Sequence, residues 1–415
     1  MAQLTDDCFA FGGKLLPIEE ALARIGERFP VIAGSETVPL HEADGRVAAQ
    51  DVYAGHDLPP FWNSAVDGYA VRHADLSDAA ETVLPVTGRL PAGAAAQALG
   101  PGAAIRIFTG APMPTGADTV FMQEDVRLEA GRVALPRGLK LGANARPAGE
   151  DLARGALAIP GGRRLRPQDL ALAAATGHAR LLVRRRLRVA LFSTGNELAE
   201  PGAPLPAGAI HDSNRVLLAS LLRRLGCTVH DLGILRDDPA TLGHHLAEAA
   251  RDHDLILTSG GVSTGEEDHV KAAVERLGRL VLWRLAIKPG RPVAAGLVAG
   301  TPFIGLPGNP VAVYVTLLFV VRPLLARLGG ALYEPPLTFP VRAGFPYRKK
   351  QGRREFVRVT LEAGAEGREA RKFSRDGAGV LTSLTGSDGL VELPDDMTNV
   401  APGDILAFHP HALLW

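Results

Sequence analysis

Cysteine is scarce in this chain: its 415 residues include only Cys8 and Cys227, far apart and in unlike surroundings. Two such residues exclude a disulfide framework and a cysteine-based zinc site. The first residues include Asp6 and Asp7 and no basic segment leading into an apolar stretch, so no secretory signal is visible. These absences predict a protein of a reducing compartment, and we expect it to be cytoplasmic.

An excess of one charge and long apolar runs are also missing. Lys plus Arg and Asp plus Glu each total 45, so the formal net charge is zero. Nothing therefore draws the chain electrostatically to nucleic acid or to an anionic membrane. The longest apolar run, residues 311–321, is about half a membrane span and predicts a buried helix. We expect no nucleic acid and no membrane among the partners.

The length and the turn residues indicate several domains. A chain of 415 residues is too long for one compact core, and 47 glycines with 31 prolines predict many turns and substantial β structure. We predict a multidomain α/β plus β fold with four parts. These are a mixed linking domain (14–53 and 156–186), an inserted β domain (54–155), an α/β domain with a parallel-rich sheet (187–333) and a C-terminal β-barrel (334–415).

Three glycine-bearing turns follow apolar runs within the α/β part, at 193–197, 259–263 and 305–310. The alternation of strand and helix patterns predicts that these turns meet at the carboxyl edge of a parallel sheet, where such sheets bind ligands. Small-residue loops at helix N-termini suit a phosphate or another oxyanion. Carboxylates nearby favour a phosphorylated ligand bridged by a divalent cation; they are Glu197, Asp212, Asp237, Asp238, Glu266, Glu267 and Asp268.

The middle turn, Ser259-Gly260-Gly261-Val262-Ser263, can cradle phosphate oxygens but fits neither a Walker loop nor the dinucleotide fingerprint. The acidic residues after it could instead compensate a helix dipole. In Lys288-Pro289-Gly290-Arg291-Pro292, two prolines hold two cations rigidly, which suits an oxyanion, although an exposed basic turn explains the pattern equally well. Asn309-Pro310 is also a good helix start.

Residues 57–71 of the inserted domain are dense in turn-forming and polar residues. A turn could bring Asn63, Ser64 and Asp67 together, but an ordinary loop in which Asn63 and Asp67 cap backbone groups is favoured on this segment alone. Asp151, in Gly149-Glu150-Asp151, has the same ordinary explanation.

Taken together, the motifs resemble the MoeA family of molybdenum-insertion enzymes, whose eukaryotic relative is the E domain of gephyrin. The matching motifs keep their order over nearly the whole chain, and this shared order is far more specific than any one motif. They are Asn63-Ser64-Ala65, 67–71, Thr109-Gly110-Ala111, 149–151, Ser193-Thr194-Gly195, Glu197-Leu198, 212–215, 260–263, Lys288-Pro289-Gly290 and 306–310. Trp62 and Asn196 depart from the family pattern, in which aspartate is common at both positions.

The resemblance implies a four-domain homodimer with an α/β domain like that of MogA-type molybdopterin adenylyltransferases. It implies insertion of molybdenum from molybdate into the dithiolene of adenylated molybdopterin, with Mg²⁺ and release of AMP. An adenylyltransferase would supply the substrate, and the active site would be shared between subunits.

The same resemblance assigns roles to individual residues. Asp67, Asp151, Glu197, Asp237 and Asp268 would be catalytic, with Asp237 and Asp268 near Mg²⁺. Substrate would be bound by Asn63, Ser64, Thr109, Ser193, Thr194, Gly195, Asp212, Ser213, Asn214, Gly260, Gly261, Ser263, Lys288, Pro289, Arg291, Pro307, Gly308 and Asn309.

Two other functions stay open on the sequence. One is a non-catalytic scaffold that binds molybdopterin, as in the receptor-clustering role of gephyrin. The other is an adenylyl-transferring or nucleotide-hydrolysing enzyme that uses the same α/β domain. The acidic set argues against the scaffold, and the inserted domain with Asp67 argues for the insertion enzyme.

Overall fold

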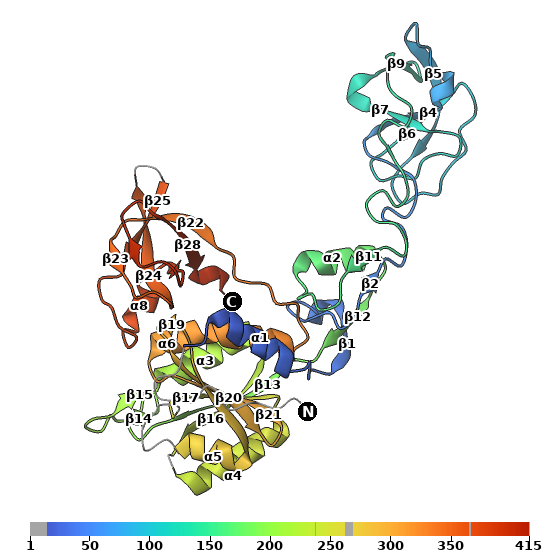
Figure 1. The fold of residues 1–415 in the computed structure, drawn as a ribbon. Helices are drawn as coiled ribbons and strands as arrows, with labels where there is room; N and C mark the ends of the chain where they lie inside the picture. Colours follow the sequence, from blue (N-terminus) through green and yellow to red (C-terminus); the bar gives the residue numbers. More distant parts are fainter. Residues whose placement is uncertain (1–14, 237, 262–268, 365–366, 415) are drawn as a thin grey trace. The chain divides into compact units, whose positions relative to one another are not determined.

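The computed structural model describes residues 15–236, 238–261, 269–364 and 367–414. They form two compact units (Figure 1). The small unit contains Thr37–Asp44 and Gln50–Leu182, and the large unit contains the described parts of Met1–Glu36, Gly45–Ala49 and Val183–Trp415. The expected multidomain α/β plus β fold is confirmed, because the large unit combines an α/β sheet with a β-barrel and the small unit is mainly β.

The small unit is built on a six-stranded sheet of order β7-β4-β6-β5-β9-β8. Its side chains alternate between two apolar clusters: Ala70 and Ile105 belong to one, Tyr69 and Val71 to the other. Both faces of the sheet are therefore covered. Its strands are β4 (Gly68–Val71), β5 (Thr82–Leu90), β6 (Ala104–Ile107), β7 (Thr119–Met122), β8 (Arg127–Glu129) and β9 (Arg132–Leu135).

Smaller elements complete this unit. Several short elements lie, in sequence, near the points where the chain passes from one unit to the other. They are the pair β2 (Val52–Tyr53) and β11 (Leu157–Ile159), the helix α2 (Pro167–Ala175), and the strands β1 (Ser35–Pro39) and β12 (Arg180–Arg184). The 57–71 segment is only partly the loop favoured above: Asn63 and Asp67 do bind backbone groups, at Phe61 and Thr109, but parts of the segment form strands. Asn63–Ser64 forms β3, which pairs with β10 (Ala145–Arg146), and β4 runs through the middle of the main sheet.

The large unit has a sheet of order β16-β13-β17-β21-β20-β18. The first four strands are parallel to one another, and β20 runs antiparallel to both of its neighbours, β21 and β18. The parallel strands are almost wholly apolar and buried, as expected for a sheet covered on both faces. The strands are β13 (Arg188–Thr194), β16 (Thr228–Leu235), β17 (Leu255–Ser259), β18 (Gly278–Arg284), β20 (Pro292–Val298) and β21 (Thr301–Leu306).

β20 was not expected from the sequence, because Ala294, Ala295 and Gly296 give it little of the β-branched character by which strands are identified. It packs well because small residues suit a close backbone approach: a Cβ at Gly296 would lie 2.2 Å from the Arg279 carbonyl oxygen.

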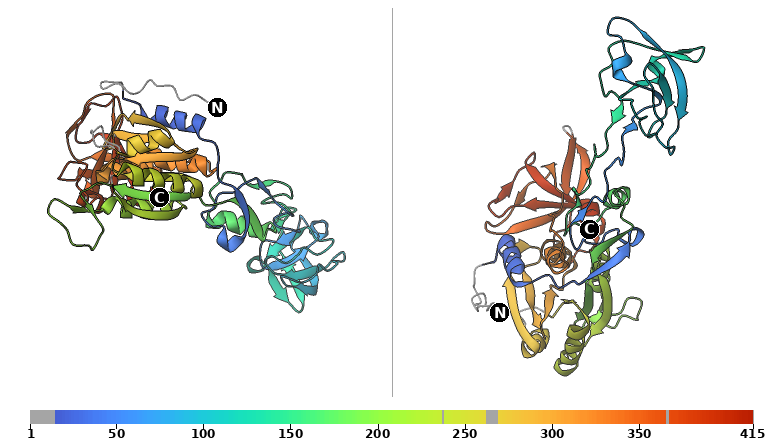
Figure 2. Two further views of the ribbon diagram at one scale, coloured as in Figure 1. Left: turned by 90° about the horizontal axis from the view of Figure 1, so that it is seen from below. Right: turned by 90° about the vertical axis from the view of Figure 1, so that its right-hand side faces the viewer.

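Helices cover the two faces of this sheet in separate groups (Figure 1, Figure 2). α4 (Pro239–Asp252) and α5 (His269–Leu277) pack on the cluster that contains Phe192 and Phe303. The opposite cluster takes α1 (Ile18–Arg28), α3 (Ser213–Arg224) and the helical run Pro310–Leu328.

The helical run Pro310–Leu328 consists of α6 (Pro310–Thr316), a π-helical turn (Leu317–Val321) and α7 (Arg322–Leu328). The wider turn ends at Val321, two residues before Pro323, which cannot supply an N–H to the helix ladder. The run is long and apolar enough to cross a membrane, but 83% of its apolar window is buried inside the protein. It is thus a core helix, as the sequence predicted.

The C-terminal part closes into a five-stranded barrel in the order β24-β25-β22-β28-β26, with β26 returning to β24. Closure leaves these strands no free edge. They are β22 (Phe339–Ala343), β24 (Arg354–Gly364), β25 (Gly367–Lys372), β26 (Gly389–Leu393) and β28 (Ile405–Pro410). The short strand β23 (Tyr347–Arg348) pairs with β27 (Asn399–Val400). The short helix α8 spans Thr382–Thr385.

The barrel and the α/β sheet share one hydrophobic core. β19 (Ile287–Lys288) leaves the α/β part and pairs in parallel with barrel strand β24. Behind this pairing, Phe319 stacks on Phe356 with ring centroids 4.1 Å apart, and His409 meets Phe319 edge-on at 5.2 Å. The aromatic contact joins the core helix to the barrel.

Replacing Phe319 tests this joint. We expect Phe319→Ala to lower the free energy of unfolding of the large unit by about 3 kcal/mol, because it empties a packed aromatic site. Urea unfolding followed by circular dichroism measures the loss. Phe339→Ala is the matched control: Phe339 is 48% exposed, so its loss should stay below about 1 kcal/mol. Equal losses in the two variants would contradict the shared core.

Candidate active site

A cleft of about 700 Å³ opens in the large unit where the α/β turns face the barrel. The α/β part lines it with the ends of β13, β17 and β21, through residues 194–197, 260–261 and 307–309, and with Lys288, Pro289 and Gly290. The barrel side adds residues 355–358, 376–378 and Tyr347. The three glycine-bearing turns therefore meet at one place, as the sequence predicted.

Two glycines in the middle turn are required by the geometry. Gly260 and Gly261 have φ values of +89° and +64°, in the left-handed region. A Cβ on Gly261 would lie 2.5 Å from a Val270 methyl and 2.6 Å from the Thr194 methyl. The turns after β13 and β17 are thus in close contact, and their backbones line the cleft without intervening side chains.

Several buried polar atoms at these strand ends have no hydrogen-bond partner within the described part of the chain. They include Ser193 Oγ, Thr194 Oγ1 and Asn214 Oδ1. The other side of the Asn214 amide is satisfied: Nδ2 donates to Ser259 Oγ at 2.9 Å and to the Gly308 carbonyl at 2.7 Å. Because unpartnered buried polar atoms are costly, their gathering at one edge indicates a polar ligand.

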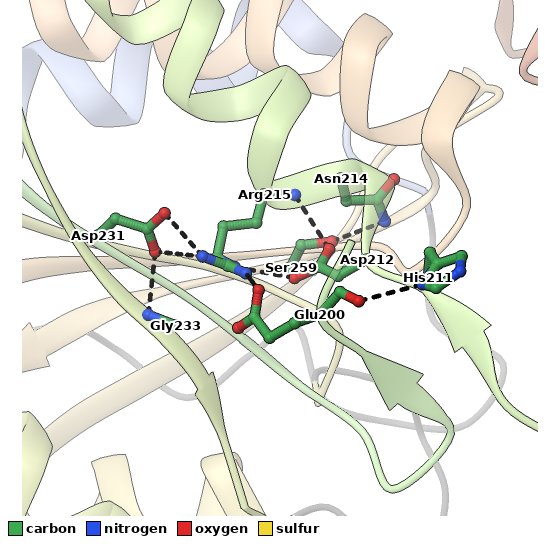
Figure 3. A network of polar contacts seen from close by, with 8 residues as sticks. All are labelled: Glu200, His211, Asp212, Asn214, Arg215, Asp231, Gly233 and Ser259. Atoms are coloured by element: carbon green, nitrogen blue, oxygen red, sulfur yellow. Dashed lines mark hydrogen bonds and ion pairs between the residues drawn. The ribbon is translucent and has the colours of Figure 1, made fainter. Parts of the chain in front are cut away.

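Arg215 ties together the segments behind this edge (Figure 3). Its guanidinium donates to Asp212 Oδ2 at 3.0 Å, to Asp231 Oδ1 at 2.6 Å and also to Glu200. The Asp212 side chain is only 2% exposed and also caps α3 by accepting from the Arg215 N–H. One cation therefore fixes the start of α3, the strand β16 and the arm that joins β14 (Leu198–Ala199) to β15 (Ile210–His211).

Within this network, Arg215 and Asp231 hold each other ionised. Burial alone would raise the pKa of Asp231, but hydrogen bonds from Arg215 and the Gly233 N–H lower it overall. Burial opposes the charge of Arg215 as well, and its hydrogen bonds to Asp231 and Asp212 raise its pKa nonetheless. None of the side chains of this network is among the residues that line the cleft, so the network supports the site from behind.

Two cations line the cleft in different settings. Lys288 Nζ donates to Glu355 Oε2 at 3.0 Å and to the Tyr347 hydroxyl at 3.1 Å. Arg358, 7% exposed, donates to the neutral oxygens of Ser383 at 3.0 Å and Gly377 at 3.1 Å. Burial lowers the pKa of Arg358, and no ion pair forms with it among the described residues. Arg358 is thus a buried cation at the cleft that has no ion pair among the described residues, although the Asp376 carboxylate of the same lining acts on it electrostatically.

The sequence did not single out Tyr347, Glu355, Arg358 or Asp376, because they come from barrel strands and loops with no recognisable motif. Among the expected residues, Asn309, Glu197 and Lys288 line the cleft. Arg291 and Ser213 are exposed and lie outside its lining, and Asp212 is buried in the Arg215 network. Asp237, Ser263 and Asp268 lie outside the described residues, so the magnesium site expected at Asp237 and Asp268 stays a prediction.

No group of three or more His, Cys, Asp or Glu side chains suited to a metal occurs in the described ranges. The described side-chain oxygens that line the cleft on the α/β side belong to Thr194, Asn196, Glu197 and Asn309, of which Glu197 is the carboxylate. This set is compatible with Mg²⁺, which takes hard oxygen ligands and commonly needs only one or two carboxylates beside phosphate oxygens.

A second group of expected residues forms within the small unit. Asp67 Oδ1 accepts from both the N–H and the hydroxyl of Thr109, each at 2.8 Å. Ser64 exchanges backbone hydrogen bonds with the same turn, accepting from Gly110 at 2.8 Å and donating to Ala111 at 3.0 Å. The hydrogen bonds from Thr109 lower the pKa of the exposed Asp67 carboxyl. Thr109 thus holds Asp67 ionised with its second oxygen available.

The remaining expected residues of this unit lie differently. Asn63 is 7% exposed and its amide donates to the Phe61 carbonyl at 3.3 Å, so it caps backbone as well as lying beside Ser64. Asp151 is exposed, and its N–H donates to the Leu58 carbonyl at 2.9 Å. No hydrogen bond joins the Asp151 carboxylate to Asp67 in the part of the chain that the structure describes.

Comparisons with known proteins agree with this architecture. Three family models match in order: the MoeA N-terminal region (domains I and II) at residues 16–177, a probable molybdopterin binding domain at 190–327, and the MoeA C-terminal region (domain IV) at 340–410. Together these three matches place the chain in a class of multidomain proteins that contain a probable molybdopterin-binding α/β domain.

Individual relatives cover nearly the whole chain. The molybdopterin molybdenumtransferase of Haemophilus influenzae is 37% identical over 400 residues, 95% of this chain and 98% of that protein. Molybdopterin molybdenumtransferase 2 of Mycobacterium tuberculosis is 39% identical over 379 residues, 88% of this chain and 93% of that protein. A crystal structure of the molybdopterin biosynthesis MoeA protein from Pyrococcus horikoshii OT3 superposes with a TM-score of 0.82 at 31% identity, covering 96% and 100% of the chains. The chain belongs to the MoeA family.

Removing Arg215 should uncover the buried acids. We expect Arg215→Met to cost about 3 kcal/mol of unfolding free energy at pH 7, because Asp212 is left buried without its cation. In the wild type, the lowered pKa of Asp231 gives stability that is present above its ordinary pKa and lost as the pH falls through its folded value. The variant lacks this contribution, so its deficit should stay nearly constant from pH 7 to 5 and shrink as the pH falls below the ordinary aspartate pKa of about 3.8.

Urea unfolding at a series of pH values measures that deficit. Arg371→Met is the control, since Arg371 pairs with Glu362 and Glu369 at the surface and its loss should cost less than about 1 kcal/mol. A deficit for Arg215→Met that stays constant even below the ordinary aspartate pKa would show that the carboxylates are not its cause.

Thr109→Val should raise the pKa of Asp67 toward its ordinary value, because the variant keeps the backbone donor and loses the hydroxyl donor. Carbon-detected NMR titration of the aspartate carboxyl groups measures the shift directly. The carboxyl of Asp78, which is exposed and distant in sequence, serves as the internal reference. An unchanged Asp67 titration in the variant would mean that the hydroxyl does not bind it in solution.

Proposed function

We propose that this protein inserts molybdenum from molybdate into the dithiolene of adenylated molybdopterin, with Mg²⁺-dependent release of AMP. The observation that carries the proposal is the cleft itself, which is lined by glycine-bearing turns and the unpartnered Thr194 hydroxyl on one side and by the buried Arg358 cation on the other. The named activity of the curated relatives supports the same reaction class.

The two sides of the cleft suit the two parts of this substrate pair. Backbone groups of the turns at Gly195, Gly260 and Gly308 would bind the pyrophosphate, because they approach a ligand without steric hindrance. Lys288 and Arg358 would bind the molybdate oxyanion, which needs cations with N–H donors. The ligand therefore lies with its phosphates toward the α/β sheet and its reacting end toward the barrel.

Asp237 and Asp268 would hold Mg²⁺, as the family resemblance implies, and the bound ion would supply positive charge where the phosphoanhydride breaks. The roles of the protein's own acids are to orient water and to move protons. Asp67, kept ionised by Thr109, is suited to accept a proton, and Glu197 and Asp151 would share this task.

We further propose a homodimer in which Asp67 of one subunit serves the cleft of the other, as the family resemblance implies. An adenylyltransferase would supply the substrate in the cytoplasm. A division into a linking domain (14–53 and 156–186), an inserted domain (54–155), an α/β domain (187–333) and a barrel domain (334–415) goes with this proposal.

The deciding experiment measures AMP released by the purified protein from adenylated molybdopterin and Mg²⁺, with and without molybdate. Molybdate-dependent AMP release with formation of active cofactor is the expected result. Tight binding without AMP release would instead favour the molybdopterin-binding scaffold, and turnover of ATP without molybdopterin would favour the nucleotide-hydrolysing enzyme.

In the same assay, Asp67→Ala should fold and dimerise like the wild type and lose most of its turnover, by about a hundredfold or more if Asp67 moves a proton. Asp268→Ala should behave in the same way. Asp78→Ala, an exposed aspartate of the small unit outside the proposed site, should keep its activity. Wild-type turnover in Asp67→Ala and Asp268→Ala would remove both residues from the mechanism.

A further inference from the structure

A triangle of hydrogen bonds lies on the barrel side of the cleft, between Lys288, Tyr347 and Glu355. Lys288 Nζ donates to Glu355 Oε2 at 3.0 Å and to the Tyr347 hydroxyl at 3.1 Å. The Tyr347 hydroxyl in turn donates a hydrogen bond to Glu355 Oε2 at 2.8 Å. Each of these three hydrogen bonds has one donor and one acceptor, so the three side chains bind one another.

The triangle is fixed from the barrel side. Glu355 is 1% exposed, and its second oxygen, Oε1, accepts from Arg353 Nε at 2.8 Å, so the carboxylate cannot turn away. Backbone pairing places the partners opposite each other, because β19 and β24 align with Lys288 beside Glu355. Tyr347 comes from the neighbouring strand β23 and also presents its ring to the ammonium, 5.7 Å from the centroid.

The lysine itself remains accessible from the cleft. Its side chain is 49% exposed, whereas Glu355 is buried beneath it. An ammonium has three N–H donors, and the triangle uses two of them. Burial alone would lower the pKa of Lys288, but the bonds to Tyr347 and Glu355 raise it, so the ammonium stays charged.

A free lysine side chain must give up much rotamer freedom when it binds a ligand. The triangle removes this freedom before the ligand arrives, which is preorganisation. We propose that Tyr347 and Glu355 are positioning residues that hold the Lys288 ammonium in one orientation, with its third N–H directed at an oxyanion in the cleft. This inference rests on the proposed function, since it deepens the oxyanion site of that reaction.

A purely structural role for the triangle, as a joint between barrel and sheet, makes a different prediction. The stacked pair Phe319 and Phe356 already joins those parts. If the triangle were only a second joint, its loss would lower stability without a selective change in oxyanion binding. The two roles therefore separate when oxyanion affinity and stability are measured on the same variants.

Tyr347→Phe is the sharpest variant, because it removes one hydroxyl and leaves every charge in place. We expect its affinity for sodium molybdate, measured by isothermal titration calorimetry on the full-length protein, to fall about fivefold, as for the loss of one hydrogen bond to a charged group. In turnover the KM for molybdate should rise, while the KM for adenylated molybdopterin stays constant.

Tyr314→Phe is the matched control. Tyr314 also joins the core helix to the C-terminal part, through a hydroxyl 2.7 Å from His411 Nδ1, but it does not line the cleft. Loss of the Tyr314 hydroxyl should lower the melting temperature of the protein without changing its affinity for molybdate. Glu355→Asp is the second variant: it keeps the charge but shortens the reach, so it should weaken molybdate binding in the same direction as Tyr347→Phe.

Lysine ammonium NMR distinguishes the possible failures, because a hydrogen-bonded ammonium exchanges its protons slowly enough to be observed. Wild-type molybdate affinity in both Tyr347→Phe and Glu355→Asp would overturn the positioning role. So would equal losses of molybdate affinity in Tyr347→Phe and Tyr314→Phe. A wild-type protein that shows the Lys288 ammonium signal and binds no molybdate would overturn the proposed function itself, and the purpose of the triangle with it.

Discussion

The pairing of β19 with β24 is the contact on which the cleft depends. Only two residues of β19 take part, yet they bring the edge of a parallel sheet against a closed barrel. The phenylalanine stack of Phe319 and Phe356 closes the core behind them, so the two parts cannot separate without exposing apolar surface. Because that core is shared, side chains from β23 and β24 reach the same space as the α/β turns.

The cleft combines two kinds of surface that a single sheet or barrel would not supply. The α/β side presents backbone at Gly260 and Gly261, where a side chain would collide with Thr194 or Val270. The facing side presents charge: within the described residues Arg358 donates to neutral oxygens, and Lys288, which β19 brings from the α/β part, is held by a buried barrel carboxylate. The first surface suits phosphates, and the second suits a compact oxyanion that must be bound and released.

Support for this edge comes from charges that never reach the ligand. Arg215 satisfies Asp212, Asp231 and Glu200 at once, and thereby holds the start of α3 against β16 and the β14–β15 arm (Figure 3). Asn214, next in the chain, extends the same support to Ser259 and Gly308. A mobile helix start would move the turns by more than the tolerance of a phosphate site.

The sequence by itself determined the order of the main strands and helices of the α/β part except β20, the glycine-bearing turns and the motif set, because apolar periodicity and left-handed glycine positions are local properties. It also indicated that the turns after β13, β17 and β21 share one edge, since parallel strands must end together. Only the tertiary structure decided that Tyr347, Glu355 and Arg358 belong to the cleft. Their strands pair through barrel closure and through β19, and such long-range pairings leave no periodic signal near the residues they bring together. The same holds for Arg215, which a local pattern presents as a helix residue and the fold makes the partner of three acids.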